Sequence, residues 1–328
     1  MAVTDTLPEQ TPKPLSGGDR PPGILADRLF SWLALGAGLT VLVILGLIIY
    51  TMTNESLPWF RAEGFNAIFS DNWVPSANHF GALGLVVGTL VVGAIALIIA
   101  VPVSIGIALF VTEVAHRRAR RPIVYTIDLL AAVPSVVFGL WALRVLEMPL
   151  ADIYSSVSGA TSGIPLLGDV FANPNPSGAS FMTAGIVVAI MITPIITAIT
   201  REVYATCPPS QKEAALALGA TRWEMIRGAV FPHSRSGVTA AVIIGFGRAV
   251  GETIAVALVI GSSPRLTEQI FGPGDTMASI IVNNFGESTG TERAALLGLG
   301  VVLLAVTVVI GILARTVLAR TRRRLGVV

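Results

Sequence analysis

Two residues of opposite charge lie four positions apart inside an apolar segment. Arg248 and Glu252 occupy the middle of residues 243–256. Each ionised side chain in the middle of a bilayer-spanning helix costs at least about 2.5–3.5 kcal/mol, so such residues are functional candidates. Helical spacing of i and i+4 places both side chains on one face, within reach of each other. The pair can therefore neutralise itself or act on a charged ligand.

Two interpretations of this pair stay open. In the first, the two charges form an ion pair that locks neighbouring helices together. In the second, Arg248 helps to carry an anion, because a planar guanidinium matches the oxygens of phosphate and stays charged at any working pH. Glu252 would then hold Arg248 when the path is empty and weaken the site enough for the anion to leave.

Glycines and prolines shape the apolar segments. Gly245, Gly247 and Gly251 remove side-chain bulk around the charged pair, which allows close helix approach or leaves space for a ligand. Pro134 and Pro194 lie inside two other apolar segments. Proline lacks the backbone N–H that a helix interior uses, so both positions predict kinks.

The composition indicates that these segments lie in a membrane. Of 328 residues, 53% are hydrophobic and 13% are charged, whereas a soluble domain has roughly 25% charged residues. The single cysteine, Cys207, excludes an intramolecular disulfide framework and a multi-cysteine metal site. The three histidines show no metal-binding spacing. We therefore expect an all-α, polytopic membrane protein that binds no metal.

Six segments are long enough to cross a bilayer, which requires about 20 apolar residues. Neighbouring helices can satisfy the backbone groups that a proline frees inside such a span, and Pro102 predicts a kink or break in the second segment. The sequence thus predicts six transmembrane helices. They cover residues 30–52, 81–111, 123–146, 180–200, 238–260 and 294–317.

The basic residues are sorted between the two sides of these segments. Six crossings place both termini on the same side, and positive charge is retained in the cytoplasm, so we expect both termini to be cytoplasmic. Arginines that directly follow a span indicate topology and contact with lipid headgroups rather than a nucleic-acid patch. Most of the 22 basic residues fall on the predicted cytoplasmic side: Lys13, Arg20, Arg28, Arg117, Arg118, Arg120, Arg121, Arg201, Lys212, Arg222, Arg227, Arg235, Arg315, Arg320, Arg322, Arg323 and Arg324.

The chain divides into four predicted parts. Residues 1–26 form a polar, Pro-rich cytoplasmic tail that is expected to be disordered. Residues 27–80 hold the first transmembrane helix and an extracytoplasmic loop, 81–318 the main transmembrane domain, and 319–328 a basic cytoplasmic tail.

Three aromatic residues lie in or beside the first predicted outer loop. Trp59, Trp73 and Phe80 fit an interfacial aromatic belt, in which amphipathic rings lie at the level of the lipid headgroups.

The loop between the fourth and fifth segments contains a helical signal. A proline pair and a serine precede a run of strong helix formers, and Gly219 follows it, which are start and stop signals for a helix over about residues 208–222. A second short helical piece is expected over residues 222–230, closed by Phe231 and Pro232. A cytoplasmic helix of this kind can dock into a groove of another protein. The alternative is an ordinary surface helix of a channel or secondary transporter.

Here the sequence resembles the permeases of bacterial ABC importers. The residues that carry the resemblance are those of the EAA signature: Glu213, Ala214, Ala215, Gly219, Phe231 and Pro232. Ala229 stands where the family commonly has Ile, and Phe231 where it commonly has Leu. The resemblance, over roughly residues 80–318, implies a MetI-like fold of the type I importers. It also implies that this segment is the coupling helix, which transmits closure of a cytoplasmic ATPase.

Within that family the sequence is similar to phosphate-transporter permeases, and closer to the C-type subunit of the Pst importer than to its A-type partner. The stretches that carry this similarity are residues 130–141, 219–237, 247–253 and 259–264. The resemblance implies a heterodimer with an A-type permease, two ATPase subunits and an extracytoplasmic phosphate-binding protein. The outer loops 149–179 and 262–291 are then the expected platform for that binding protein.

No ATP hydrolysis is expected from this chain itself. It lacks a Gly-rich phosphate loop ending in Lys and Ser or Thr, so the resemblance implies that the partner ATPase binds the ATP and Mg²⁺ and that this chain holds no cofactor. Two rival functions stay open: a permease for another oxyanion such as sulfate or molybdate, and a secondary transporter or channel that needs no ATPase.

Overall fold

The computed structural model describes residues 24–324, without the side chains of residues 24–26, 117 and 317–324. The chain divides into two compact units, Met1–Thr51 and Met52–Val328. Helix α1 (Ile24–Glu63) runs through the boundary, so its first part belongs to unit 1 and its end to unit 2. The tail predicted to be disordered lies almost entirely outside the described residues.

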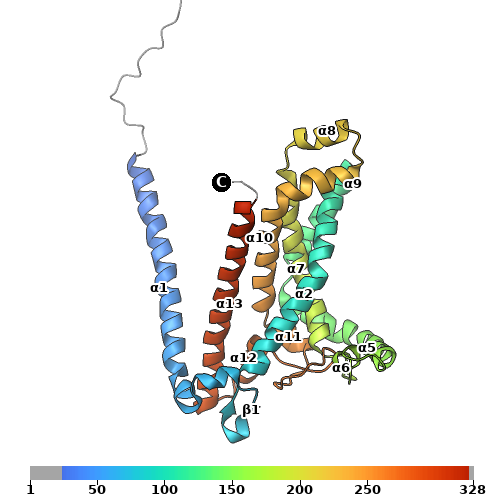
Figure 1. The fold of residues 1–328 in the computed structure, drawn as a ribbon. Helices are drawn as coiled ribbons and strands as arrows, with labels where there is room; N and C mark the ends of the chain where they lie inside the picture. Colours follow the sequence, from blue (N-terminus) through green and yellow to red (C-terminus); the bar gives the residue numbers. More distant parts are fainter. Residues whose placement is uncertain (1–23, 325–328) are drawn as a thin grey trace, which may run out of the picture. The chain divides into compact units, whose positions relative to one another are not determined.

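Unit 2 is built almost entirely from helices (Figure 1), which confirms the all-α prediction. Its strands are the two-residue β1 (Trp73–Val74) and β2 (His79–Phe80), which form a small antiparallel hairpin. Turns of 3₁₀ helix cover Phe65–Phe69 and Pro75–Ala77, and π-helical turns cover Phe110–Val114, Ala142–Leu146 and Ile226–Val230. The helices after α1 are α2 (Leu83–Leu109), α3 (Arg117–Ala131), α4 (Ser135–Trp141), α5 (Glu147–Thr161), α6 (Leu167–Val170), α7 (Phe181–Ala205), α8 (Pro209–Ala217), α9 (Arg222–Met225), α10 (Phe231–Val250), α11 (Ile254–Val259), α12 (Met277–Asn284) and α13 (Gly290–Arg324).

Four described helices are long and apolar enough to cross a membrane by themselves. They are Asp27–Glu63 of α1, Leu83–Val114 of α2 and the π-helical turn that follows it, α7, and Gly290–Thr316 of α13. The bent segment of α3, α4 and α5 brings the number to five. This confirms a multi-pass membrane fold, and the count of six crossings stays a prediction.

The third predicted crossing, residues 123–146, is wrong as a continuous helix. The chain bends by 92° between Arg118–Ala131 and Ser135–Thr161. Pro134 lies in extended backbone as the N-cap of α4, because proline has no N–H to donate and disfavours helical geometry in the residue before it. The predicted kink at Pro134 is therefore a sharp corner.

The fifth predicted crossing, residues 238–260, is also broken. Helix α10 ends at Val250, and α11 begins at Ile254. Gly251 has low helix propensity, and the Thr253 hydroxyl donates a hydrogen bond of 3.2 Å to the Gly251 carbonyl, a local bond that competes with the helical pattern. The prediction treated residues 251–253 as helical because their neighbours are apolar.

Two other proline predictions are corrected. Helix α2 continues through Pro102, so the break that was the alternative to a kink there is wrong. Pro232 does not close a separate short helix, since it lies in the first turn of α10. Proline is tolerated there because the first-turn N–H groups have no partner within the helix, so α9, the π-helical turn and α10 follow one another without a break.

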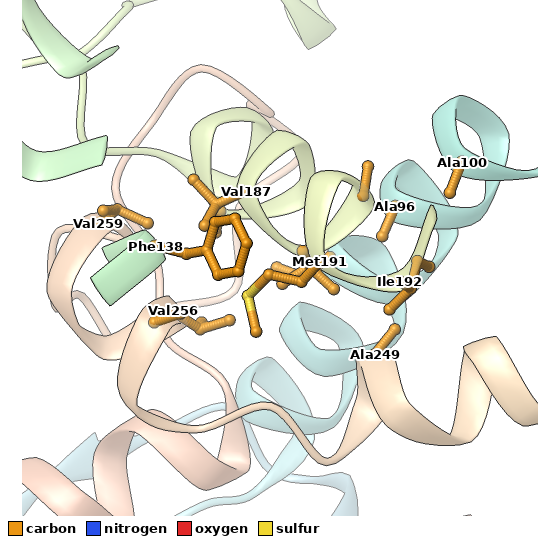
Figure 2. Packing of buried hydrophobic residues seen from close by; sticks show 14 of the residues in the cluster. Ala96, Ala100, Phe138, Val187, Met191, Ile192, Ala249, Val256 and Val259 are labelled. Carbon is orange, nitrogen blue, oxygen red and sulfur yellow. The ribbon is translucent and has the colours of Figure 1, made fainter. Parts of the chain in front are cut away.

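The main core of unit 2 lies where α2, α7 and α10 pack on one another. Small residues of α2 and α10, such as Ala96 and Ala249, face Ile192 of α7, while Phe138 of α4 points toward Met191 (Figure 2). All of these side chains are at least nine-tenths buried. Alanines on neighbouring helices allow the backbones to approach closely, which is how membrane helices pack without a strong hydrophobic driving force.

A second core joins the end of α1, the β-hairpin and α13. Trp59 is fully buried, lies against Gly298 and donates its indole N–H to the Phe80 carbonyl at 3.0 Å. Trp73 contacts Phe80 edge to face, with ring centroids 5.2 Å apart. The prediction of an interfacial aromatic belt is therefore wrong for these three rings, because they are buried inside a small subdomain formed by the end of α1, the hairpin and α13.

Candidate functional site

Helix α10 positions Arg248 on its exposed face. Residues Ile244, Gly247 and Arg248 are exposed, whereas Ala241 and Ala249 on the opposite face are buried. This alternation follows the helical period and aims the guanidinium away from the core of its own chain. The Arg248 side chain is 52% exposed.

The carboxylate of Glu252 lies beneath this guanidinium. The Arg248 Nη2 and Glu252 Oε2 atoms are 3.8 Å apart, and the Glu252 side chain is 6% exposed. The predicted proximity is therefore present, although Glu252 lies past the end of α10 and not on one continuous helix. A separation of 3.8 Å exceeds the hydrogen-bond range, so Glu252 attracts the guanidinium without holding it in a fixed geometry.

The three glycines near the pair have different surroundings. Gly245 is buried against Ile196 of α7, and a Cβ there would lie 2.6 Å from that side chain. Gly247 has open space around it, and Gly251 forms the C-cap of α10. Gly245 thus permits helix packing, Gly247 leaves space beside Arg248, and Gly251 ends the helix.

The structure brings together α4 and α11, two short helices that are far apart in the sequence. Helices α4 and α11 pack closely, and a Cβ on Gly139 would lie 2.9 Å from the Ala255 Cα atom. Phe138 enters the core beside Val256 and Val259 (Figure 2). The corner at Pro134 and the break after Gly251 therefore produce two short helices that support each other.

Pro194 lies buried in α7, which continues through it. The Ser104 hydroxyl of α2 donates a 3.1 Å hydrogen bond to the neighbouring Thr193 carbonyl. This bond joins α2 to α7 beside the proline.

Helix α8 lies across one end of unit 2 (Figure 1). The C-terminal part of α13 extends toward the same end. It contains Glu213, Ala214 and Ala215, and none of its side chains is buried. Gly219 follows it with φ of +84°, a left-handed conformation that glycine adopts without strain at the end of a helix. Leu218 is 90% exposed, so an apolar surface is available at this end of the helix.

Two contacts connect α8 to the membrane helices. The Lys212 Nζ atom donates to the Glu113 Oε1 atom at 2.6 Å, and both side chains are largely buried. Ala215 packs against the small core of Tyr204, Met225 and Val230.

The chain continues from α8 through a capped turn into α9. Thr221 and Glu224 form a capping box, and the Thr221 hydrogen bonds lower the pKa of the Glu224 carboxyl.

Sequence reasoning missed Glu113. Lys212 and Glu113 are 99 residues apart, so no local spacing relates them. The one available signal is an acidic residue at the end of an apolar span, directly before a cluster of arginines.

Known proteins are similar to this chain over nearly its whole length. The family described as "Binding-protein-dependent transport system inner membrane component" matches residues 100–324. A protein of Xylella fastidiosa named "Phosphate transport system permease protein PstC" is 42% identical over 326 residues, which cover 99% of this chain and 100% of that protein. A protein of the same name from Mesorhizobium japonicum is 39% identical over 304 residues, 92% of this chain and 93% of that protein.

Two solved structures share the fold. A bacterial alginate ABC transporter superposes with a TM-score of 0.60 at 17% identity, covering 93% of this chain and 99% of that one. The MetNI methionine ABC transporter, in an inward-facing conformation, gives a TM-score of 0.51 at 16% identity, covering 73% of this chain and 94% of that one. Together with the match over residues 100–324 and the near-full-length relatives, these likenesses show that the chain belongs to the family of inner membrane components of binding-protein-dependent transport systems.

Proposed function

We propose that this chain is the C-type permease subunit of an ATP-driven importer that carries inorganic phosphate across the bacterial cytoplasmic membrane. It forms half of the translocation path, and an A-type permease forms the other half. The near-full-length similarity to permeases named for phosphate transport supports this substrate.

The observation that carries the proposal is the half-exposed Arg248 guanidinium beside the break between α10 and α11, in the segment predicted to be the fifth crossing. Irregular backbone at membrane depth is tolerated where it is buried in protein or lines a water-filled cavity, and transporters place substrate sites at such discontinuous helices. Arg248 then supplies a charged fork for phosphate, and the buried Glu252 carboxylate lowers the affinity so that phosphate moves on.

The remaining subunits act at the two ends of the path. Two ATPase subunits bind ATP and Mg²⁺, and one of them docks on α8, whose exposed residues and ion pair with Glu113 suit the transmission of movement. An extracytoplasmic phosphate-binding protein docks on the outer loops 149–179 and 262–291. Both termini lie in the cytoplasm, as the distribution of arginines favours.

The test is phosphate uptake by cells that carry Arg248→Ala in an otherwise intact importer. Uptake should fall at least tenfold while the complex still assembles, because the path loses its fixed positive charge. Arg61→Ala, at an exposed arginine near the end of α1, serves as the matched control and should leave uptake within about twofold.

Two results would contradict the proposal. Unimpaired uptake by the Arg248→Ala importer would limit Arg248 to a structural role. Phosphate movement by the purified chain alone, driven by an ion gradient in vesicles without ATPase subunits, would identify a secondary transporter.

A further inference from the structure

A groove of about 800 Å³ lies between α3 and α7, away from Arg248. Four arginines and one glutamate are among the side chains that line it, and α3 packs directly on α7. The lining residues are Arg118, Arg120, Arg121, Val124, Tyr125, Arg201 and Glu202.

The positive charge of this groove is only partly compensated. Arg201 pairs with Glu202 at 3.0 Å. Within the described part of the chain, Arg118, Arg120 and Arg121 form no ion pair with a carboxylate.

The position of these arginines on α3 adds to the uncompensated charge. They lie in the first turns of this 15-residue helix. The N-terminal end of a helix carries partial positive charge and favours anions, so three guanidiniums there repel both the helix end and one another. A bound anion would relieve both repulsions.

The surface beyond the arginines is apolar. Tyr125 is 64% exposed and Leu129, one turn further along α3, is 71% exposed. The exposed surface of α3 thus changes along its length from basic to apolar, the order in which an anionic phospholipid changes from headgroup to acyl chain. Such basic pockets between helices on the cytoplasmic side bind lipid headgroups.

We propose that the α3–α7 groove binds a phosphate group through Arg118, Arg120, Arg121 and Arg201. The guanidinium fork suits a phosphate oxygen pair, and two sources can supply that group. One is the headgroup of an anionic phospholipid, which the apolar surface at Tyr125 and Leu129 favours. The other is free phosphate in the cytoplasm.

The test uses the complete transporter in nanodiscs of phosphatidylcholine with or without phosphatidylglycerol. Native mass spectrometry then measures the phosphatidylglycerol that stays bound after release from the bilayer. Arg120→Gln with Arg121→Gln should reduce retention several-fold. Arg222→Gln with Arg227→Gln removes the same charge from exposed positions outside the groove and should retain the lipid like the unchanged protein.

A second variant separates recognition from charge. Arg120→Lys with Arg121→Lys keeps the charge that directs membrane insertion but removes the planar fork, so retention should fall although the protein inserts normally. Labelled inorganic phosphate, added to nanodiscs of phosphatidylcholine alone, tests the second source. Binding that is lost in the Gln variant would assign the groove to free phosphate.

Equal lipid retention and equal phosphate binding by all variants would overturn the proposal. None of these measurements uses transport, so the outcome is independent of the role given to Arg248.

Discussion

The side chains of Arg248 and Glu252 differ strongly in their exposure. The guanidinium is 52% exposed, and the carboxylate beside it is 6% exposed. A buried charge is costly unless it is paired, so Glu252 keeps Arg248 close even though the two atoms are 3.8 Å apart. Because no hydrogen bond fixes the guanidinium to the carboxylate, the pair fits the brief binding of phosphate that we propose for it.

Gly219 allows a prediction about the backbone alone. A Cβ at this position would meet no atom within 4 Å, yet φ is +84°, and left-handed backbone costs a residue with a Cβ about 1–2 kcal/mol. Gly219→Ala should therefore shift the end of α8 and reduce the phosphate transported per ATP hydrolysed. Gly228→Ala is the matched control, since it also meets open space but has no positive φ. Equal transport ratios for the two variants would contradict a requirement for this geometry.

Asp275 lies outside the membrane-spanning helices, and its carboxyl should make the stability of the fold depend on pH. Burial raises the pKa of its carboxyl to about 6, although Ser279 and Ser262 donate hydrogen bonds to it. The folded protein then holds this proton more tightly than the unfolded chain. The resulting stability is fully present below the ordinary pKa of 3.8 and is lost as the pH rises through about 6.

Asp275→Asn should remove that dependence. The amide oxygen can accept from Ser279, and the amide nitrogen can donate to the Ser262 hydroxyl, which is able to act as an acceptor. No charge is buried at neutral pH, so the variant should be more stable than the unchanged protein at pH 7 by roughly 1–3 kcal/mol. The melting temperature of each protein in detergent between pH 4 and pH 7 measures the difference. Parallel curves over this range would show that Asp275 does not titrate there.

Helix α8 is attached to the membrane helices by few contacts, and the ion pair of Lys212 with Glu113 joins it to the end of α2. Both side chains are largely buried, so the pair is shielded from screening by salt. The π-helical turn that contains Glu113 is of a kind frequent at functional sites. Movement of α8 would therefore reach α2 directly.

A charge exchange tests this connection. Lys212→Glu alone places two carboxylates together and should uncouple ATP hydrolysis from phosphate uptake by tenfold or more. Adding Glu113→Lys restores the attraction in reverse and should recover much of the coupling, as expected for residues that interact directly. If the double variant is no better than the single one, the ion pair does not carry the movement.

The orientation of the chain in the membrane can be tested with introduced cysteines. Ser155 on α5 and Ser210 on α8 are both exposed and belong to opposite ends of unit 2 (Figure 1). The native Cys207 is buried, and burial raises the pKa of its thiol, so it should give little background. In intact cells a membrane-impermeant maleimide should label Ser155→Cys but not Ser210→Cys. The reverse pattern would invert the proposed topology.

The sequence alone determined that the chain is an all-α membrane protein and where most of its helices lie. Long apolar segments, and arginines that gather on one side of them, are local or additive signals. They can be recognised in a sequence without knowledge of how the helices pack. The motif around Glu213 and Gly219 and the charged pair Arg248 and Glu252 were likewise visible, because each depends on spacing within a single stretch of chain.

The tertiary structure alone decided how those segments break and meet. The corner at Pro134 and the break after Gly251 are stable because α4 and α11 pack on each other, and no single segment contains that information. The same reason applies to Trp59, whose place in a core depends on Phe80 and α13, and to Glu113, whose partner lies 99 residues away. Contacts between distant segments depend on the path of the whole chain. They place the Trp59 ring in a core and pair Glu113 with Lys212, and neither result can be read from the local sequence.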